Sequence, residues 1–172
     1  IYINKINNLC WIIDSAQIID FVDINSDTTY DLGSGAGLPG LVVAIVMKNL
    51  KIDMKVSLFE KSYHKCVFLK DVSKELNLNT EVIQKDIFKL KNMETGTVMS
   101  RAFKPMPLVL NLVNENFKRF KNIIFFMGKN GKKVLKETLQ HWDLDYEEKK
   151  SLTNEDSFIL NIKKIKKKLS WK

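Results

Sequence analysis

The run from Asp31 to Gly40 limits the possible folds more than any other feature of this chain. It reads Asp-Leu-Gly-Ser-Gly-Ala-Gly-Leu-Pro-Gly, follows the strand-like segment Thr28–Leu32 and opens the segment Leu38–Leu50. That second segment is apolar almost all round, as in a helix packed against a sheet. Glycines permit a tight turn and let a ligand approach the backbone, while the N-terminus of the next helix favours negative charge. The run therefore predicts a strand, a ligand-binding loop and a helix in that order.

Strand-like and helix-like segments alternate along the rest of the chain. Helices are also expected at Lys61–Leu76 and Lys129–Trp142, and the polar stretch Lys150–Asp156 joins the last two strands without a helix between them. The pattern predicts an α/β fold with a mostly parallel seven-stranded sheet, a C-terminal antiparallel hairpin and helices on both faces. This arrangement resembles Rossmann-like class I methyltransferases and differs from ordinary dinucleotide dehydrogenases. The expected strands are Thr28–Leu32, Lys55–Phe59, Glu81–Ile83, Gly96–Ser100, Asn122–Met127, Tyr146–Lys149 and Phe158–Ile165.

Size and composition are those of one globular domain. The chain has 172 residues, of which 45% are hydrophobic and 28% charged, so residues 1–172 are expected to share one core. Cys10 and Cys66 have no disulfide-framework, redox or metal-ligand spacing. The apolar runs are much shorter than the ~20 residues that span a bilayer, and no signal peptide is recognisable. A cytoplasmic protein without membrane contact is expected, with a monomer as the default.

The spacing of the loop glycines separates two classes of cofactor. A dinucleotide site usually shows G-x-G-x-x-G, which would place a glycine at Leu38, whereas this loop reads G-x-G-x-G. Asp31 precedes the first glycine by two positions, and a carboxylate there suits the amino group and sulfonium cation of S-adenosylmethionine better than a pyrophosphate. The loop therefore predicts S-adenosylmethionine as cofactor. A nicotinamide enzyme and a turn without any ligand are the alternatives.

Two acidic residues after later strands are candidates for the nucleoside part of that cofactor. Glu60 ends the second strand and can accept hydrogen bonds from both ribose hydroxyls, although a solvated carboxylate paired with Lys61 is the alternative. Asp86 follows the third strand and can accept from the adenine amino group, with Ile87 and Phe88 beside the ring. Asp86 also fits the N-cap of a following turn.

Arg101 follows the fourth strand, in Ser100-Arg101-Ala102-Phe103. Ligands bind at the carboxyl ends of the strands in open α/β sheets, so Arg101 is expected to face the active cleft. It could bind an RNA phosphate, a guanine edge or the carboxylate of the methyl donor. A structural ion pair with Asp31 is the alternative.

Three motifs together resemble the bacterial glucose-inhibited division protein B family, also called small-subunit rRNA methyltransferase G. They are Asp31–Gly40 with its closing Leu-Pro-Gly, Ser100–Phe103 and the early Ile13-Asp14-Ser15, and the resemblance covers nearly the whole chain. It implies S-adenosylmethionine-dependent methylation of guanine N7 in 16S rRNA of the small ribosomal subunit. The residues expected at the cofactor are Asp31, Gly33, Ser34, Gly35, Gly37, Leu38, Glu60, Asp86, Ile87, Phe88 and Arg101.

The chain departs from the family pattern at several positions. The family usually has His at Trp11, Arg at Asp86, Glu at Phe88 and Lys at Met127. The segment before Asp14 is also shorter than in the family, so residues 1–25 are expected to form a shortened helical cap. Met127 and the short cap leave open the alternative of a catalytically weakened RNA-binding relic.

The expected reaction needs little from the protein beyond positioning. Guanine N7 carries a lone pair and no proton, so no general base is expected, no catalytic residue is assigned, and Arg101 is expected to position substrate or donor. His64 and His141 have no partners at metal-ligand spacing, and no metal is expected. A small-molecule methyltransferase would share the cofactor site without needing a basic surface.

A net charge of +8 favours a polyanionic partner, although a solubilising surface gives the same excess. Many of the lysines gather near the C-terminus, where Lys166, Lys167, Lys168 and Lys172 extend the run. A solvated polar face is the alternative. The residues expected to bind RNA phosphates are Lys129, Lys132, Lys133, Lys163 and Lys164.

Overall fold

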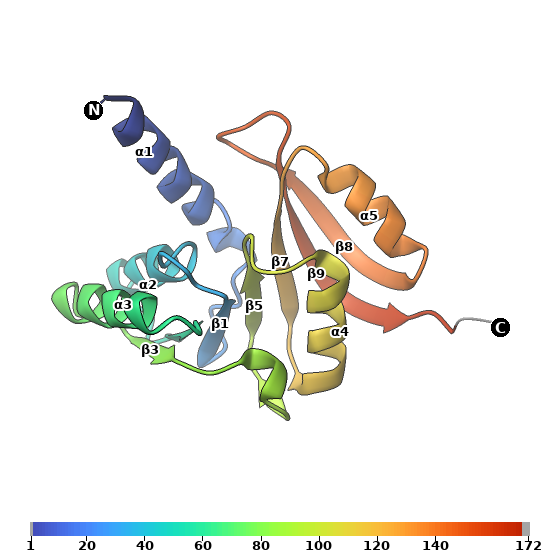
Figure 1. Ribbon diagram of the computed structural model, residues 1–172, viewed down its shortest axis with the longest axis horizontal. Coiled ribbons are helices and arrows are strands. Elements are labelled where there is room, and N and C mark those ends of the chain that lie inside the picture. Colours follow the sequence, from blue (N-terminus) through green and yellow to red (C-terminus); the bar gives the residue numbers. More distant parts are fainter. Residues whose placement is uncertain (1, 170–172) are drawn as a thin grey trace.

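A computed structural model describes residues 2–169, with side chains from Leu9 onward. Its central feature is a seven-stranded sheet of order β3-β2-β1-β5-β7-β9-β8 (Figure 1). The strands of this sheet are β1 (Thr28–Leu32), β2 (Lys55–Phe59), β3 (Thr80–Ile83), β5 (Thr97–Ser100), β7 (Asn122–Met127), β8 (Trp142–Lys150) and β9 (Phe158–Lys167).

The sheet is parallel from β3 to β7 and antiparallel at its other edge. β1 pairs in parallel with β2 and β5, and β7 continues this direction beside β5. β9 then runs antiparallel to β7, and β8 runs antiparallel to β9. The expected mostly parallel seven-stranded sheet with a C-terminal antiparallel hairpin is therefore confirmed.

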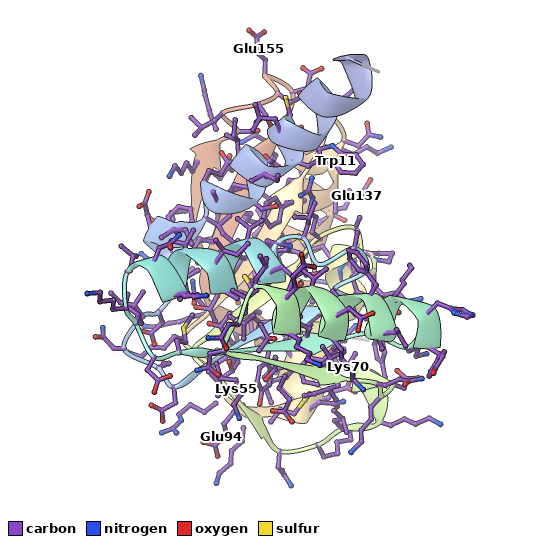
Figure 2. The ribbon with its side chains drawn as sticks, turned by 90° about the vertical axis from the view of Figure 1, so that its left-hand side faces the viewer. Trp11, Lys55, Lys70, Glu94, Glu137 and Glu155 are labelled. Carbon is purple, nitrogen blue, oxygen red and sulfur yellow. The ribbon has the colours of Figure 1, made fainter. Side chains whose placement is uncertain are left out.

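Helices cover both faces of this sheet, as Figure 1 shows. On one face lie α2 (Gly40–Asn49) and α3 (Tyr63–Glu75), and on the other lie α4 (Met106–Asn116) and α5 (Gly131–Leu139). Helix α1 (Tyr2–Ala16) contacts α2 and is followed by the short 3-10 helix η1 (Ile19–Phe21). In Figure 2, α1 lies above α2 and α3.

Alternation along the strands produces two apolar cores. In β7, Ile123 and Phe125 join the core beneath α4 and α5, whereas Ile124 between them joins the core beneath α2. In β9, Leu160 and Ile159 divide in the same way. Successive side chains point to opposite faces of a strand, so a strand covered on both faces is apolar at every position. This explains the continuous apolar run of β7.

The predicted helices need two corrections. Helix α5 ends at Leu139, and Trp142, expected on the helix, begins β8 and is buried. Helix α4 was not expected, because Pro105 and Pro107 at its start obscured the helical spacing of the apolar residues that follow.

A second small sheet pairs β4 (Met93–Glu94) with β6 (Phe117–Arg119), and the short 3-10 helix η2 (Ile87–Lys89) precedes it in the chain. Within residues 2–169, no helix is long and apolar enough to cross a membrane.

Candidate functional site

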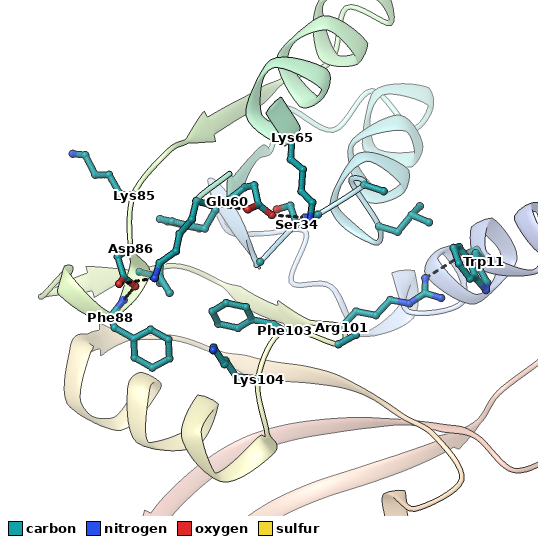
Figure 3. A pocket seen from close by; sticks show the side chains of 18 residues that line it. Trp11, Ser34, Glu60, Lys65, Lys85, Asp86, Phe88, Arg101, Phe103 and Lys104 are labelled. Carbon is teal, nitrogen blue, oxygen red and sulfur yellow. Dashed lines mark hydrogen bonds and ion pairs between the residues drawn. The ribbon is translucent and has the colours of Figure 1, made fainter. Parts of the chain in front are cut away.

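A cavity of about 630 Å³ opens at the carboxyl ends of the parallel strands (Figure 3). Its wall comes from the segments that follow β1, β2, β3 and β5, with Trp11 added from α1. β1 lies between β2 and β5, so this is the switch point where ligands bind in open α/β sheets. The lining residues are Trp11, Gly33, Ser34, Gly35, Ala36, Leu38, Phe59, Glu60, Lys61, Lys65, Lys85, Asp86, Ile87, Phe88, Arg101, Ala102, Phe103 and Lys104.

The glycine loop owes its shape to a backbone conformation that other residues rarely adopt. Gly33, Gly35 and Gly37 have φ values of 71°, 57° and 89°. A Cβ on Gly33 would overlap the ring of Phe103, and Ser34 N donates to Phe59 O at 3.0 Å. The loop therefore lies against the ends of two neighbouring strands and exposes its backbone to the cavity.

Asp31 lies behind this loop and does not line the cavity. It is 1% exposed, and its Oδ2 accepts a hydrogen bond from Gly40 N at 3.1 Å, at the start of α2. Burial raises the pKa of Asp31 to about 7, against the lowering effects of Ser34, Gly40 and Arg101. Asp31 thus supports the loop and the start of α2 from behind, and its expected contact with the donor's positive groups stays a prediction. Gly37 likewise lies outside the cavity wall.

Glu60 connects the end of β2 to the glycine loop. Its Oε2 accepts from Gly35 N at 3.0 Å, and its Oε1 accepts from Lys61 N and Ser62 N, both at 2.8 Å. The alternative ion pair with Lys61 is not formed, because Lys61 Nζ lies 2.8 Å from Asp86 Oδ2. Glu60 lines the cavity, and its role as ribose ligand stays a prediction.

Asp86 begins a small apolar shelf on the β3 side of the cavity. Its Oδ1 accepts from Phe88 N at 3.2 Å, so it is the N-cap of η2, as the alternative interpretation expected. The hydrogen bond from Lys61 is the main cause of its lowered pKa. Ile87 is buried, while Phe88 is 38% exposed and lies 6.0 Å from Phe103 between ring centroids. The two aromatic rings and Ile87 form a surface suited to a flat heterocycle.

Arg101 lies on the opposite side of the cavity, where α1 holds it in place (Figure 3). Its Nη2 is 3.4 Å from Asp14 Oδ2, and its Nη1 donates to Ser15 Oγ at 3.0 Å and to Trp11 O at 3.4 Å. The alternative ion pair with Asp31 is therefore wrong, because Asp14 is the partner. The expectation that Arg101 faces the cleft is confirmed by its place in the cavity wall.

Asp14 also connects α1 to the loop between β8 and β9. Its Oδ1 accepts from Ser151 Oγ at 3.1 Å and from Thr153 Oγ1 at 3.3 Å. Gln17 strengthens this connection, because its Oε1 accepts from Leu152 N at 3.0 Å. The position of Arg101 thus depends on two distant segments, one on α1 that lies 86 to 90 residues before it and one that begins 50 residues after it, at Ser151.

Several residues of the wall were not among the expected site residues. Phe103 belongs to the Ser-Arg-Ala-Phe motif and Trp11 is a departure from the family pattern, but the sequence predicted neither at the cofactor. Closeness to Ile13-Asp14-Ser15 is the signal that could have placed Trp11 in the site. Lys65, Lys85 and Lys104 carry no sequence signal that distinguishes them from other surface lysines.

The lysines expected to bind RNA divide into two groups. Lys132 pairs with Glu148 and covers the Phe158 ring, and Lys163 pairs with Glu147 at 3.1 Å. For Lys129, Lys133 and Lys164, no carboxylate of the described residues lies within ion-pair distance. Lys172 lies outside the described residues. Within the same part of the chain, no cluster of three or more His, Cys, Asp or Glu side chains could hold a metal ion.

The fold is that of the Rossmann-like class I methyltransferases. A putative rRNA-methylase from Clostridium thermocellum aligns with a TM-score of 0.59 and 16% identity, covering 87% of this chain and 92% of that one. A putative transferase from Pyrococcus horikoshii aligns with a TM-score of 0.63 and 13% identity, covering 90% and 63%. Identities this low support the fold alone.

Sequence comparison defines the family. The family model described as rRNA small subunit methyltransferase G matches residues 1–161. The ribosomal RNA small subunit methyltransferase G of Pelagibacter ubique is 60% identical over 157 residues, which cover 91% of this chain and 74% of the relative. That of Dinoroseobacter shibae is 33% identical over 152 residues, covering 88% and 77%. The chain belongs to the rRNA small subunit methyltransferase G family.

Proposed function

We propose that this protein transfers the methyl group of S-adenosylmethionine to N7 of a guanine in 16S rRNA of the small ribosomal subunit. The observation that carries the proposal is the cavity at the switch point, where the glycine loop, Glu60 and the η2 shelf follow one another along three strand ends. Membership of the rRNA small subunit methyltransferase G family is the basis for naming rRNA as the substrate. S-adenosylmethionine supplies an electrophilic methyl group when it is bound.

The residues of the cavity fit this cofactor along its length. Asp86, Ile87 and Phe88 provide an acceptor and apolar surface for adenine, and Glu60 provides a carboxylate for the ribose. Gly33, Ser34, Gly35 and Leu38 offer backbone at a place where a Cβ on Gly33 would fill the space against Phe103. Asp31 supports the loop from behind, and Gly37 lies within the loop where a Cβ would overlap the Leu41 side chain.

The wall also suits a reaction without proton transfer. Its titratable side chains are Lys, Arg, Glu and Asp, and neither His nor Cys lines it. Guanine N7 attacks through a lone pair, so the protein has to position two reactants and exclude water. Arg101, held by Asp14 and Ser15, is the positioning residue on the substrate side.

A basic surface supports RNA over a small molecule as substrate. Lys65, Lys85 and Lys104 line the cavity, and Lys129, Lys133 and Lys164 are exposed and therefore available to RNA phosphates. Lys132 and Lys163 contribute less in this proposal, because carboxylates already neutralise them. We further propose a cytoplasmic monomer that needs no metal, with residues 1–172 as one domain and residues 1–25 as its cap.

The alternative of a weakened relic loses part of its basis. Met127, where the family usually has Lys, is 8% exposed and packs in the core beneath α4 and α5. At this position the chain therefore has apolar packing in place of a charge, and Lys129, two residues further along, is exposed.

The test is incubation with labelled S-adenosylmethionine and small subunits that lack the modification, followed by nucleoside analysis. Label in 7-methylguanosine is expected, and subunits already methylated at that guanine serve as the control that takes up none. Tight binding of the donor without label would support the relic. Label in a small molecule but not in RNA would support the small-molecule enzyme.

A further inference from the structure

We propose that Trp11 and Arg101 form the subsite for the target guanine, with the indole of Trp11 stacking on the base. This inference rests on the proposed function and names the part of the cavity that receives the substrate. It assigns a role to Trp11, which lines the cavity without belonging to the expected donor-binding set.

Sheet order separates the two ends of the cavity. The neighbouring strands β3, β2 and β1 lead into the η2 shelf, Glu60 and the glycine loop, and these account for the adenosine and amino-acid parts of the donor. β5 is the next strand, and Arg101 and Trp11 stand beyond its end (Figure 3). A base that reacts with the methyl group therefore enters from the β5 and α1 side.

Trp11 has the exposure that a stacking residue needs. Its side chain is 54% exposed although it lies in the wall of a cavity, and it projects from α1 (Figure 2). Its neighbour Ile12 is 47% exposed but does not line the cavity. Proteins that read unpaired RNA bases commonly stack them on aromatic side chains. An exposed indole at the reacting end of the site matches this mode of recognition.

Arg101 is held in a position where it can complete the subsite. Its guanidinium carbon lies 5.8 Å from the Trp11 ring and 5.3 Å from the Phe126 ring. Two hydrogen bonds and the Asp14 ion pair still leave N–H groups free, because a guanidinium has five of them. A free N–H can donate to guanine O6, while N7 must stay unbonded for its lone pair to attack.

The charge that develops during the reaction favours an aromatic neighbour. The N7 lone pair forms the new N–C bond as the S–C bond breaks, so the positive charge leaves sulfur and appears on the purine. The sulfonium becomes a neutral thioether, and no proton moves. The face of an indole attracts a positively charged purine more strongly than it attracts a neutral one. Trp11 therefore interacts more strongly with the transition state than with the bound guanine, which raises the rate of methyl transfer.

Three variants test this subsite in single-turnover assays on unmethylated small subunits, with the Kd of S-adenosylmethionine measured separately. Trp11→Ala should lower the rate of methyl transfer by about 5- to 100-fold, the range expected for loss of one base–aromatic stack. Trp11→Phe keeps a ring and should stay within about 5-fold of wild type. Ile12→Ala is the matched control on α1 and should not change the rate. The Kd for the donor should be the same in all three.

A second measurement keeps the inference testable if Trp11→Ala does not fold. Tryptophan fluorescence should be quenched when a guanine-containing loop oligonucleotide is added to the donor complex, and Trp11→Phe should remove that quenching. A wild-type rate for Trp11→Ala, equal losses for Trp11→Ala and Ile12→Ala, or quenching that survives in Trp11→Phe would overturn the subsite. Absence of 7-methylguanosine with the wild-type protein would instead overturn the proposed function.

Discussion

The glycine loop after β1 and the β8–β9 hairpin both stand out in the sequence, but they differ in how tightly the structure constrains them. In the loop, Gly33 has a positive φ and no room for a Cβ, and Glu60 accepts three backbone hydrogen bonds beside it. In the hairpin, lysines such as Lys163 meet carboxylates across the strands and remain exposed. A pattern that requires one backbone conformation therefore indicates a site more reliably than an excess of charge does.

Asp31→Asn should give the largest effect, because it removes a buried titratable carboxyl group behind the loop. With the pKa of Asp31 raised to about 7, the folded protein keeps a proton that the unfolded chain releases above about pH 4. The stability due to Asp31 is therefore complete below about pH 4 and is lost as pH rises to about 7, by on the order of 4 kcal/mol. As pH rises from about 4 to about 7, the free energy of unfolding of Asp31→Asn should increase relative to that of wild type by this amount.

Urea titrations at several pH values between about 4 and 8 measure this difference. Asp156→Asn in the exposed hairpin loop is the control for removal of a carboxylate. A difference between Asp31→Asn and wild type that does not change with pH would show that the carboxylate behind the loop does not titrate in this range.

Gly33→Ala tests the loop itself and should be the next largest effect. A methyl group there combines a positive φ with overlap of the Phe103 ring, so a loss of stability of about 2–3 kcal/mol is expected, with weaker donor binding. Gly128→Ala is a matched control, because a Cβ at that position meets nothing within 4 Å. Thermal melts and calorimetric titration with the donor compare them. Equal effects at both glycines would contradict the special role of the loop.

Glu60→Gln should have a smaller effect, because an amide retains one of two oxygens. The variant cannot accept hydrogen bonds from Gly35, Lys61 and Ser62 on two separate oxygens, which should cost about 1–2 kcal/mol. The Kd of the donor should rise about 10-fold. Glu155→Gln in the exposed hairpin loop is the control. Unchanged donor affinity would remove Glu60 from the binding site.

Single lysine substitutions should give the smallest effects and test the other half of the comparison. Lys129→Ala should reduce the salt dependence of RNA binding by about 0.7–0.9 in the logarithmic slope, as expected when one phosphate contact is lost. Lys163→Ala should change it less, because Glu147 already neutralises that charge. Binding isotherms over a range of salt concentrations measure both slopes. A larger change for Lys163→Ala would show that the hairpin lysines contact RNA despite their ion pairs.

The sequence predicted the sheet well because its signals are local. The bounds of β1, β2 and β7 agree with the expected segments, since each is short and rich in β-branched, aromatic or other apolar residues. The glycine loop and the cavity positions of Glu60, Asp86 and Arg101 could be predicted because strand ends in a parallel sheet meet at one edge.

The contacts made over long sequence distances could not be predicted. Asp14 meets Arg101 and Ser151 only because α1, β5 and the hairpin loop converge, and no spacing in the sequence records this. The burial of Asp31 behind the loop is similar, because its acidic character suggested a ligand contact while packing made it an acceptor for Gly40 N.

The position of β9 has a consequence for synthesis of the chain. β9 is the last strand of the described chain, yet it lies between β7 and β8. When β8 leaves the ribosome it has no neighbour to join, and the edge of β7 stays unpaired until Phe158–Ile162 has been made. Unpaired strand edges and uncovered apolar faces promote aggregation. A chain terminated before Phe158 would keep the glycine loop but would be an aggregation-prone product, not a smaller enzyme.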